Sequence, residues 1–288
     1  MYAAYGAVMR YSKVGLIAGG GPLPHAVIAG ARESGTDIFV ASLKGFSDPG
    51  DFEGIDTDLF RLGEIGRLVK TLKSKKVEAI CFAGIVKRPD FSALRPDARG
   101  LKYLPGVIKA ATKGDDSLLR YVTQMFEKEK IAVIGPQEIC KSLLAPSGVI
   151  GKVAPDNAQM EDAQKARKIA KDIGALDIGQ GAVVSAGLVL AVEAQEGTDL
   201  MLQRVAQLPA DHKNGANRSG VLAKMVKPGQ EERIDLPVVG LNTLEGVKAA
   251  GLSGIVVEAG RAFIMDRVSL ISQADDAGLF IIALEPEA

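Results

Sequence analysis

A charged stretch at residues 222–240 (LAKMVKPGQEERIDLPVVG) has side chains suited to phosphoryl chemistry. Its cations are Lys224, Lys227 and Arg233, and its carboxylates are Glu231, Glu232 and Asp235. Lys and Arg neutralise phosphate oxygens, whereas Asp and Glu hold Mg²⁺ or orient a water molecule. Pro228-Gly229 predicts a turn, and apolar runs on both sides would anchor the loop in a core. The alternative is a solvated charged hairpin loop, which this stretch on its own favours.

A second acidic stretch, residues 192–202 (VEAQEGTDLML), precedes a helical pattern. Glu193, Glu196 and Asp199 are spaced so that they could face the cations of the later loop and share a metal or a phosphate. Thr198 or Asp199 could instead be the N-cap of the helix. Spacing alone does not decide between these interpretations.

Three glycines, Gly19, Gly20 and Gly21, follow the first apolar run and precede Pro22, Leu23 and a helical pattern. Such a turn lets the backbone approach a phosphate at a helix N-terminus. The sequence lacks a G-x-x-x-x-G-K-[ST] loop and the G-x-G-x-x-G fingerprint, and Lys44 stands where an acid would bind a ribose. A nicotinamide cofactor is therefore disfavoured. Another nucleotide or phosphate ligand and a purely structural turn both remain open.

Two surface features carry weaker signals. Asp115-Asp116 precedes a helical pattern, so these acids either cap the helix or bind a ribose or a base edge. Residues 94–113 alternate basic and apolar side chains, which suits an anionic membrane surface or the covering of a lipid tail. An ordinary surface helix and loop is the favoured alternative for this segment.

The pattern of elements places these residues in an α/β protein. Buried strands are predicted at 14–18, 38–43, 79–85 and 131–135, and helices at 25–33, from 63, and 117–128. This alternation predicts βαβ units and a Rossmann-like parallel sheet in a first domain at 12–140. In a second domain at 144–288, the predicted elements are a helix from Asp156 to 173, a hairpin at 182–194, a helix or loop at 196–205, a helix at 243–249 and strands at 254–257 and 279–284. They predict a mixed α/β domain.

Composition limits the remaining classes. The 288 residues include 35 basic and 35 acidic ones and no Trp, which argues against a nucleic-acid partner. Cys81 and Cys140 are expected to be buried thiols, and His25 and His212 lack ligand spacing, so any metal should be a hard cation held by oxygen. No signal peptide or spanning helix is predicted, and Met9 could be the natural start. We expect a cytoplasmic protein that touches a membrane surface.

Seven segments, in this order, resemble one known family. They are LIAGGGPLP at 16–24, AGIVKRPDF at 83–91, GDDSLLR at 114–120, ALDIGQ at 175–180, VEAQEGTDLML at 192–202, KPGQEERIDLP at 227–237 and GLSGIVVEAGR at 251–261. The chain resembles the UDP-2,3-diacylglucosamine pyrophosphatases of lipid A synthesis, in the form found in many Gram-negative bacteria that lack the metallophosphoesterase version. The resemblance covers nearly all of residues 13 to 285.

The resemblance implies an activity. The family hydrolyses UDP-2,3-diacylglucosamine to UMP and lipid X, with water attacking the α-phosphorus and Mg²⁺ required. Its N-terminal domain holds the nucleotide, and its C-terminal domain grips most of the lipid and carries the catalysis. The implied partners are the substrate, lipid X and the cytoplasmic surface of the inner membrane; a homodimer is left open.

The resemblance also assigns residues. The family's essential acid matches Asp235, which we expect to coordinate Mg²⁺ or to orient the attacking water. The expected catalytic residues are Asp235, Lys224 and Lys227, and the expected metal ligands are Asp235, Glu193, Glu196 and Asp199. The expected substrate-binding residues are Gly19, Gly20, Gly21, Pro22, Leu23, Gly84, Lys87, Asp115, Asp116, Gln180, Thr198, Gln230 and Arg233. Glu231 departs from the family's usual Asp, which puts a direct ligand role there in doubt.

Two other classes stay open. A non-catalytic sensor of nucleotide sugars or lipids would bind substrate without metal-dependent turnover. A doubly wound oxidoreductase would bind nicotinamide, against which the glycine spacing and Lys44 argue.

Overall fold

A computed structural model describes residues 11–209 and 219–287. The chain forms two compact units. The first is Met1–Lys141 together with Glu231–Ile234, and the second is Ser142–Gln230 together with Asp235–Ala288. His212 and the first ten residues, about which the sequence raised questions, lie outside the described residues.

A five-stranded parallel sheet of order β3-β2-β1-β4-β5 forms the centre of the first unit. Its strands are β1 (Lys13–Ala18), β2 (Asp37–Leu43), β3 (Thr57–Phe60), β4 (Ala79–Ala83) and β5 (Ala132–Ile134). Strands β1, β2, β4 and β5 are mainly apolar, as expected for strands covered on both faces, whereas the edge strand β3 is partly exposed. The strand order reverses between β1 and β4, and ligands of open α/β sheets bind outside the carboxyl ends of strands at such a switch point.

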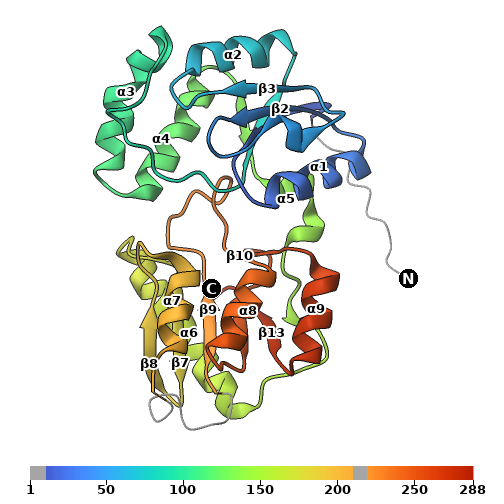
Figure 1. Cartoon of the computed structure of the whole chain (residues 1–288), viewed down its shortest axis with the longest axis vertical. Helices are drawn as coiled ribbons and strands as arrows, with labels where there is room; N and C mark the ends of the chain where they lie inside the picture. The colour runs from blue at the N-terminus through green and yellow to red at the C-terminus, as the bar shows by residue number, and fades with distance from the viewer. Residues whose placement is uncertain (1–10, 210–218, 288) are drawn as a thin grey trace. The chain divides into compact units, whose positions relative to one another are not determined.

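Helices cover both faces of this sheet, as Figure 1 shows. One face carries α1 (Leu23–Ser34), α5 (Pro136–Ile139) and the short helix η1 (Pro49–Phe52). The other carries α2 (Ile65–Ser74), α3 (Ala98–Ala111) and α4 (Asp115–Lys128). The second short helix, η2 (Lys141–Leu143), lies where the chain leaves this unit.

The second unit contains a six-stranded mixed sheet of order β6-β13-β11-β9-β7-β8. Its strands are β6 (Gly148–Val149), β7 (Gly181–Ser185), β8 (Leu188–Val192), β9 (Val221–Lys224), β11 (Gly254–Glu258) and β13 (Phe280–Leu284). Strands β9, β11 and β13 are parallel to one another, whereas β6, β7 and β8 pair in antiparallel fashion. A separate two-stranded sheet joins β10 (Val238–Val239) to β12 (Phe263–Ile264).

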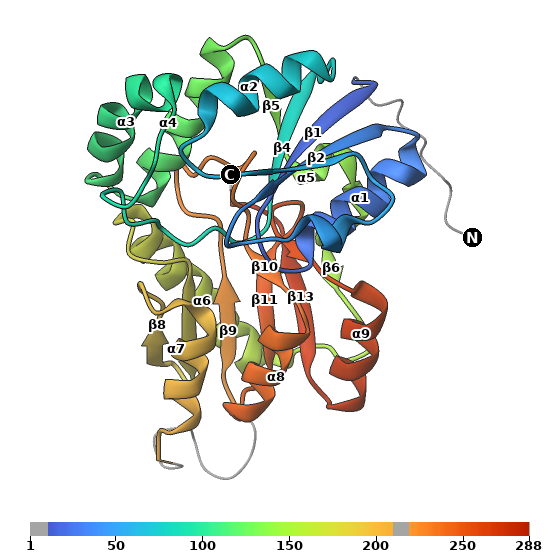
Figure 2. The same cartoon turned by 45° about the horizontal axis from the view of Figure 1, so that its top comes forward.

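The helices of the second unit also form two layers. One face of the large sheet carries α7 (Gly197–Ala206), α8 (Leu241–Ala249) and α9 (Arg267–Asp276), and the other carries α6 (Asn157–Ala175), as Figures 1 and 2 show. Side chains alternate between the two cores along β9, where Leu222 packs toward α7 and Ala223 toward α6. This alternation decides which face each polar residue at the strand ends points to.

The structure confirms the predicted α/β class, with a parallel first sheet and a mixed second one. Asp156 caps α6 and accepts a hydrogen bond from the Gln159 amide, as predicted. The predicted hairpin is β7–β8, whose turn residues Ala186 and Gly187 have the positive φ values of a tight hairpin turn. Both cysteines are buried free thiols, as expected. No helix among the described residues is long and apolar enough to span a membrane.

Candidate functional site

Polar side chains line up at one end of the second sheet, across β8, β7 and β9. Glu193 directly follows β8, and its amide donates to the carbonyl of Gly181 at the start of β7 at 2.8 Å. Gly181 in turn pairs with Lys224, the last residue of β9. Because side chains alternate between faces, Glu193 and Lys224 both point to the face that carries α7. The fold therefore gathers an acid and a base that are 31 positions apart in sequence.

Glu193 is a buried carboxylate, with 6% of its surface exposed. Its Oε1 accepts a hydrogen bond at 3.0 Å from the hydroxyl of Thr198, in the first turn of α7, and its Oε2 is buried with no hydrogen-bond partner. Burial raises the pKa of Glu193, and the nearby Lys224 ammonium opposes this rise. A buried acceptor of this kind calls for a cation or a donor that residues 11–209 and 219–287 do not supply.

Lys224 is the base of this cluster and is 7% exposed. Its Nζ donates to the carbonyl of Val238 at 2.9 Å. Burial lowers the pKa of Lys224, and the negative charges of Glu193, Asp199 and Asp235 oppose this effect. An ammonium group has three donors, so Lys224 can also donate to a phosphate oxygen.

Asp235 reaches the same cluster from the charged loop. Its Oδ2 accepts a hydrogen bond at 2.5 Å from the side-chain amide of Gln230. The Oε1 of Gln230 accepts from the Lys227 amide at 2.8 Å, so this buried glutamine fixes the fold of the loop. Asp235 acts electrostatically on both Glu193 and Lys224.

Glycines flank this cluster where backbone and side chains approach closely. A Cβ at Gly179 would lie 2.2 Å from the Glu193 carbonyl oxygen, and one at Gly181 would lie 2.4 Å from Glu193 Oε2. Gln180, between these glycines, has a buried Oε1 without a hydrogen-bond partner. By the alternation of side chains along β7, Gln180 lies on the α6 face, opposite to Glu193.

The carboxylate oxygens of this cluster are ligands of the type that a hard cation prefers, but the protein would supply only a few of them. Among residues 11–209 and 219–287, no group of three or more His, Cys, Asp or Glu side chains is arranged to hold a metal. Of the four predicted ligands, Glu193 and Asp235 lie in the cluster. Asp199 is exposed but acts on Lys224, and Glu196 pairs with Arg204 at 2.9 Å. Mg²⁺ is commonly held by one or two carboxylates together with substrate phosphates, and a metal held by Glu193 and Asp235 stays a prediction.

Lys227, predicted to be catalytic, contacts a different group. Its Nζ lies 2.7 Å from Asp177 Oδ1, and its side chain packs against Gly174 in the last turn of α6. A cation is favoured at a helix C-terminus, which explains this placement. Asp177 was not among the predicted site residues, although it lies within the ALDIGQ segment.

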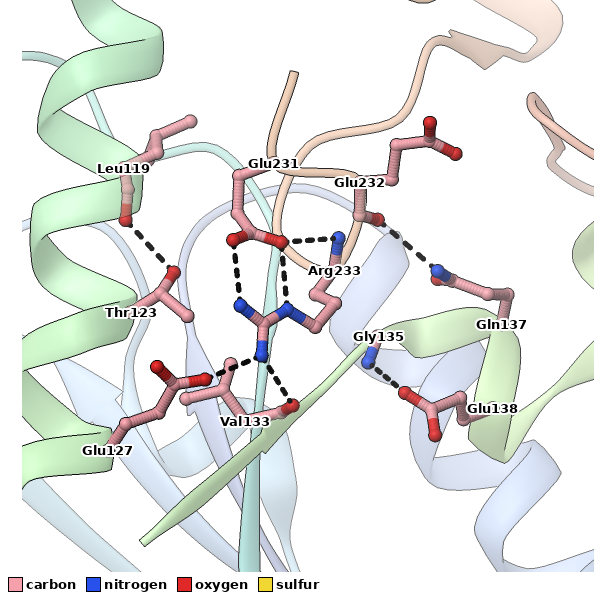
Figure 3. Close-up of polar contacts among 10 residues, drawn as sticks. All are labelled: Leu119, Thr123, Glu127, Val133, Gly135, Gln137, Glu138, Glu231, Glu232 and Arg233. Atoms are coloured by element: carbon pink, nitrogen blue, oxygen red, sulfur yellow. Dashed lines mark hydrogen bonds and ion pairs between the residues drawn. The ribbon is translucent and has the colours of Figure 1, made fainter. Parts of the chain in front are cut away.

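Arg233 and Glu231 lie in the first unit and bind each other, as Figure 3 shows. The Arg233 Nε and Nη2 each donate to a Glu231 carboxylate oxygen at 2.8 Å. Its Nη1 donates to Glu127 at 2.7 Å and to the Val133 carbonyl at 3.5 Å. This fork geometry anchors residues 231–234 to α4 and β5. Substrate binding by Arg233 stays a prediction, because a phosphate would have to compete with both carboxylates.

The alternative of a solvated hairpin is wrong for the charged loop. Strand β9 pairs with β7 and β11, whereas β10 pairs with β12, so the loop does not join two hairpin strands. Lys224 and Gln230 are buried, as are Met225 and Val226 between them.

The glycine turn of the first unit lies at the switch point between β1 and β4. Gly20 and Ile85 exchange two backbone hydrogen bonds, at 2.9 and 2.8 Å. A Cβ on Gly19 or Gly84 would lie within 2.7 Å of the opposite loop's backbone, and Gly21 has a φ of 85°. Close packing therefore explains these glycines. No side chain caps the N-terminus of α1, which begins at Leu23 after Pro22, so its first amides are suited to an anion.

The remaining predicted binding residues of the first unit, Lys87, Asp115 and Asp116, differ in their contacts and in their exposure. Lys87 is exposed. Asp115 pairs with Arg88 at 3.6 Å, and both Asp115 and the buried Asp116 lie in the first turn of α4, where negative charge is favoured. Gly114, rather than either acid, is the N-cap residue of this helix. Likewise, the N-cap of α7 is Glu196, so the capping roles considered for Thr198 and Asp199 are wrong.

Comparison with known proteins matches both halves of the chain to one family. The profile of the LpxI N-terminal domain matches residues 13–143, and that of the LpxI C-terminal domain matches residues 146–282. The UDP-2,3-diacylglucosamine pyrophosphatase LpxI of Caulobacter vibrioides is 50% identical over 278 residues, which cover 96% of this chain and 98% of that protein. A crystal structure of isoflavone reductase is 13% identical, with a TM-score of 0.26 over 96% of this chain and 78% of that one, and no argument rests on it.

Proposed function

We propose that this chain, which belongs to the LpxI family, hydrolyses the pyrophosphate bond of UDP-2,3-diacylglucosamine in lipid A biosynthesis. The products are UMP and 2,3-diacylglucosamine 1-phosphate, or lipid X. The observation that carries the proposal is 50% identity to a protein of that named activity over 96% of the chain. The buried cluster of Glu193, Lys224 and Asp235 supplies chemistry of the required type.

Lys224 and the start of α7 would neutralise the pyrophosphate. Lys224 keeps ammonium donors in a dry environment, where attraction to a phosphate is stronger than in water. The first amides of α7 and its positive dipole end lie beside Glu193, because Thr198 in that first turn donates to Glu193. A dianionic substrate would thus offset the cost of burying the Lys224 charge.

Glu193 and Asp235 are the residues that would hold Mg²⁺. The unsatisfied Oε2 of Glu193 supports this assignment. Bound there, Mg²⁺ would withdraw charge from the phosphate oxygens and favour attack by water. Glu196 and Asp199 have no part in the first coordination sphere of this proposal, because both are exposed.

Asp235 would orient the attacking water and accept its proton. Its Oδ2 is held by Gln230, so the carboxylate keeps one orientation. Attack on the α-phosphorus forms a bond from the water oxygen to that phosphorus and breaks its bond to the bridging oxygen. The bridging oxygen leaves with lipid X, and the incoming oxygen stays in UMP.

The two units would divide the substrate between them. The first unit would bind the nucleotide at its switch point, where the uncapped start of α1 faces the glycine turn. The second unit would hold the lipid and carry out the hydrolysis. The proposal includes action in the cytoplasm.

The decisive experiment follows turnover in water enriched in heavy oxygen. Full-length protein, with Mg²⁺ or with EDTA, is incubated with UDP-2,3-diacylglucosamine, and the products are read by mass spectrometry. Asp235→Asn is compared with Asp172→Asn, which changes an exposed aspartate on α6. We expect label in UMP alone, lost with EDTA and with Asp235→Asn but kept with Asp172→Asn.

Other outcomes would revise specific parts. Label in lipid X would keep the enzyme class but move the attack to the other phosphorus. Full turnover with EDTA would remove the metal, and full turnover by Asp235→Asn would remove the role of this carboxylate. Tight substrate binding with no product would favour a non-catalytic sensor.

A further inference from the structure

Helix α3 (Ala98–Ala111) of the first unit presents an apolar stripe to solvent. Leu101 is 59% exposed and Ile108 is 41% exposed. Leu104, which is half-buried, and the exposed Pro105 lie between them. These four positions follow i, i+3, i+4 and i+7, so they share one face of the helix.

The opposite face of α3 is packed within the first unit. Gly100 and Tyr103 are buried, and the Tyr103 hydroxyl donates to Glu129 at 2.9 Å. Asp97 caps the helix by accepting from the Gly100 amide. Figure 1 shows α3 on the outer side of α4. The helix is thus held in place by its inner face, and its apolar stripe is left without a partner in the part of the chain that the structure describes.

Positive charge accompanies this stripe. Helix α3 contains no acidic residue, and Lys102 and Lys109 lie seven positions apart along one side of the stripe. Residues 85–113 contain seven basic and two acidic residues, although the whole chain has 35 of each. One of the two acids, Asp97, is used as the helix cap. Arg88 and Arg99 pair with Asp115 and Glu129 of the following helix region, so the positive charge beside the stripe is that of Lys102 and Lys109.

We propose that the α3 surface, formed by Leu101, Leu104, Pro105, Ile108, Lys102 and Lys109, binds an anionic lipid bilayer. The apolar side chains enter the boundary between headgroups and acyl chains, and the two lysines bind lipid phosphates. A nucleic acid would bind the lysines through its phosphates but would leave the apolar stripe exposed to water, so a bilayer is the better occupant. A second copy of the chain would bring the like charges of Lys102 and Lys109 to the contact, so it is the less suitable occupant.

Docking through α3 would bring the protein to the surface in which a diacylated substrate is held, and the inference does not depend on hydrolysis. This mode of binding requires no membrane-spanning segment, because α3 would lie in the plane of the membrane interface.

The test is cosedimentation of the full-length protein with vesicles, without substrate. Vesicles of phosphatidylcholine alone are compared with vesicles that also contain phosphatidylglycerol. We expect binding that needs phosphatidylglycerol, weakens as salt is raised and falls at least ~100-fold in L101E/I108E. Lys102→Gln with Lys109→Gln should lower binding about tenfold or more.

Matched controls change similar residues elsewhere. Val268→Glu alters a more exposed apolar residue, on α9, and Lys70→Gln with Lys248→Gln removes two exposed lysines from α2 and α8. Both should bind vesicles as the unaltered protein does. Because the altered α3 side chains are exposed, circular dichroism and the melting temperature should stay unchanged in every variant.

Several results would overturn the proposal. Undiminished vesicle binding by L101E/I108E would do so, as would an absence of binding by the unaltered protein. A dimer that L101E/I108E dissociates, without vesicle binding, would assign this face to a second copy instead. Hydrolysis of a short-chain, water-soluble substrate should be unchanged in the α3 variants, so failure of the membrane proposal and failure of the proposed activity can be told apart.

Discussion

Two groups of buried charges lie at the same end of the second sheet, on its opposite faces. Lys224 ends β9 on the α7 face, and its register partner in β11 is Val257. The next residue, Glu258, therefore points to the α6 face, where it is 0% exposed. There it pairs with Lys171 at 2.7 Å, and with Arg167 and Arg261 at 3.4 Å each.

The two groups differ in how fully their carboxylates are satisfied. Glu258 faces three cations, and Arg167 also donates to the Glu285 carbonyl, so this group ties α6 and the C-terminal segment to the sheet. Glu193 has one buried oxygen without a partner, and burial shifts the pKa of Glu193 up and that of Lys224 down. A saturated network is suited to holding structure, whereas an unsatisfied one is suited to a ligand that completes it.

Replacing Lys224 by Met should have the largest effect on activity. The variant keeps the length of the side chain but removes the charge that would neutralise the pyrophosphate. We expect kcat to fall about a thousand-fold, since buried electrostatic stabilisation is worth factors of this size. Steady-state kinetics of Lys224→Met, with Lys171→Met as the matched control from the other network, would measure this. Equal losses in both variants would remove the functional distinction between the two groups.

Replacing Glu258 by Gln should act mainly on stability. Removal of one partner from a buried ion-pair group leaves uncompensated charge and costs ~3 kcal/mol or more. Urea unfolding of Glu258→Gln would show this loss as a lower midpoint with an unchanged slope. Turnover per folded molecule should stay close to that of the unaltered protein, and a large fall in kcat without a loss of stability would contradict the assignment.

Glu193 should give the protein a pH-dependent response to Mg²⁺. Burial raises the pKa of Glu193 above its ordinary value of 4.5. At pH values between the ordinary pKa and the raised one, the folded protein keeps a proton that the unfolded chain has released. Without metal, this contribution to stability is present below the ordinary pKa and is lost as pH rises through the raised one. Mg²⁺ binds the deprotonated carboxylate, so it should raise the melting temperature more above the raised pKa than below it.

Glu193→Gln provides the control for that experiment. The amide does not titrate, so the variant should lose the part of the pH dependence that Glu193 supplies and most of the Mg²⁺ response. A full Mg²⁺ response in Glu193→Gln would place the metal elsewhere.

Arg233→Lys should have the smallest effect. Lysine keeps the charge but cannot bind Glu231 with two parallel hydrogen bonds. Because the guanidinium is partly exposed, the loss of stability should be about 1 kcal/mol or less. KM should be unchanged if Arg233 only anchors the loop, whereas a tenfold rise in KM would support its predicted contact with substrate. Thermal unfolding and initial-rate kinetics would separate these outcomes.

Short apolar runs that alternate with amphipathic helical patterns were enough to predict most of the strands and helices. Strands such as β1 and β13 are continuous apolar runs, and α2 has a clear apolar face. The elements that were missed carry little local signal. Strands β10 and β12 have two residues each and exist only because they pair with each other. Helix α9 has buried residues only at Leu270 and Ala274, so its sequence shows a weak helical pattern.

The candidate site was predicted in residue type but not in arrangement. Sequence placed Glu193, Lys224 and Asp235 in one hypothesis because their charges suit phosphoryl transfer. It could not separate Glu193 from Glu196, since only the register of β8 with β7 turns one inward and leaves the other to pair with Arg204. It also grouped Lys227 and Arg233 with Lys224, although each binds a different carboxylate.

The assignment of Glu231–Ile234 to the first unit has a consequence for dividing the gene. The chain passes between the units after Lys141, after Gln230 and after Ile234, so no single cut separates them. A fragment that stops at Lys141 would expose Glu127 and Gln137 without the Arg233 and Glu232 groups that they bind. A fragment that keeps all contacts of the first unit would therefore have to include residues 231–234 as well as residues up to Lys141.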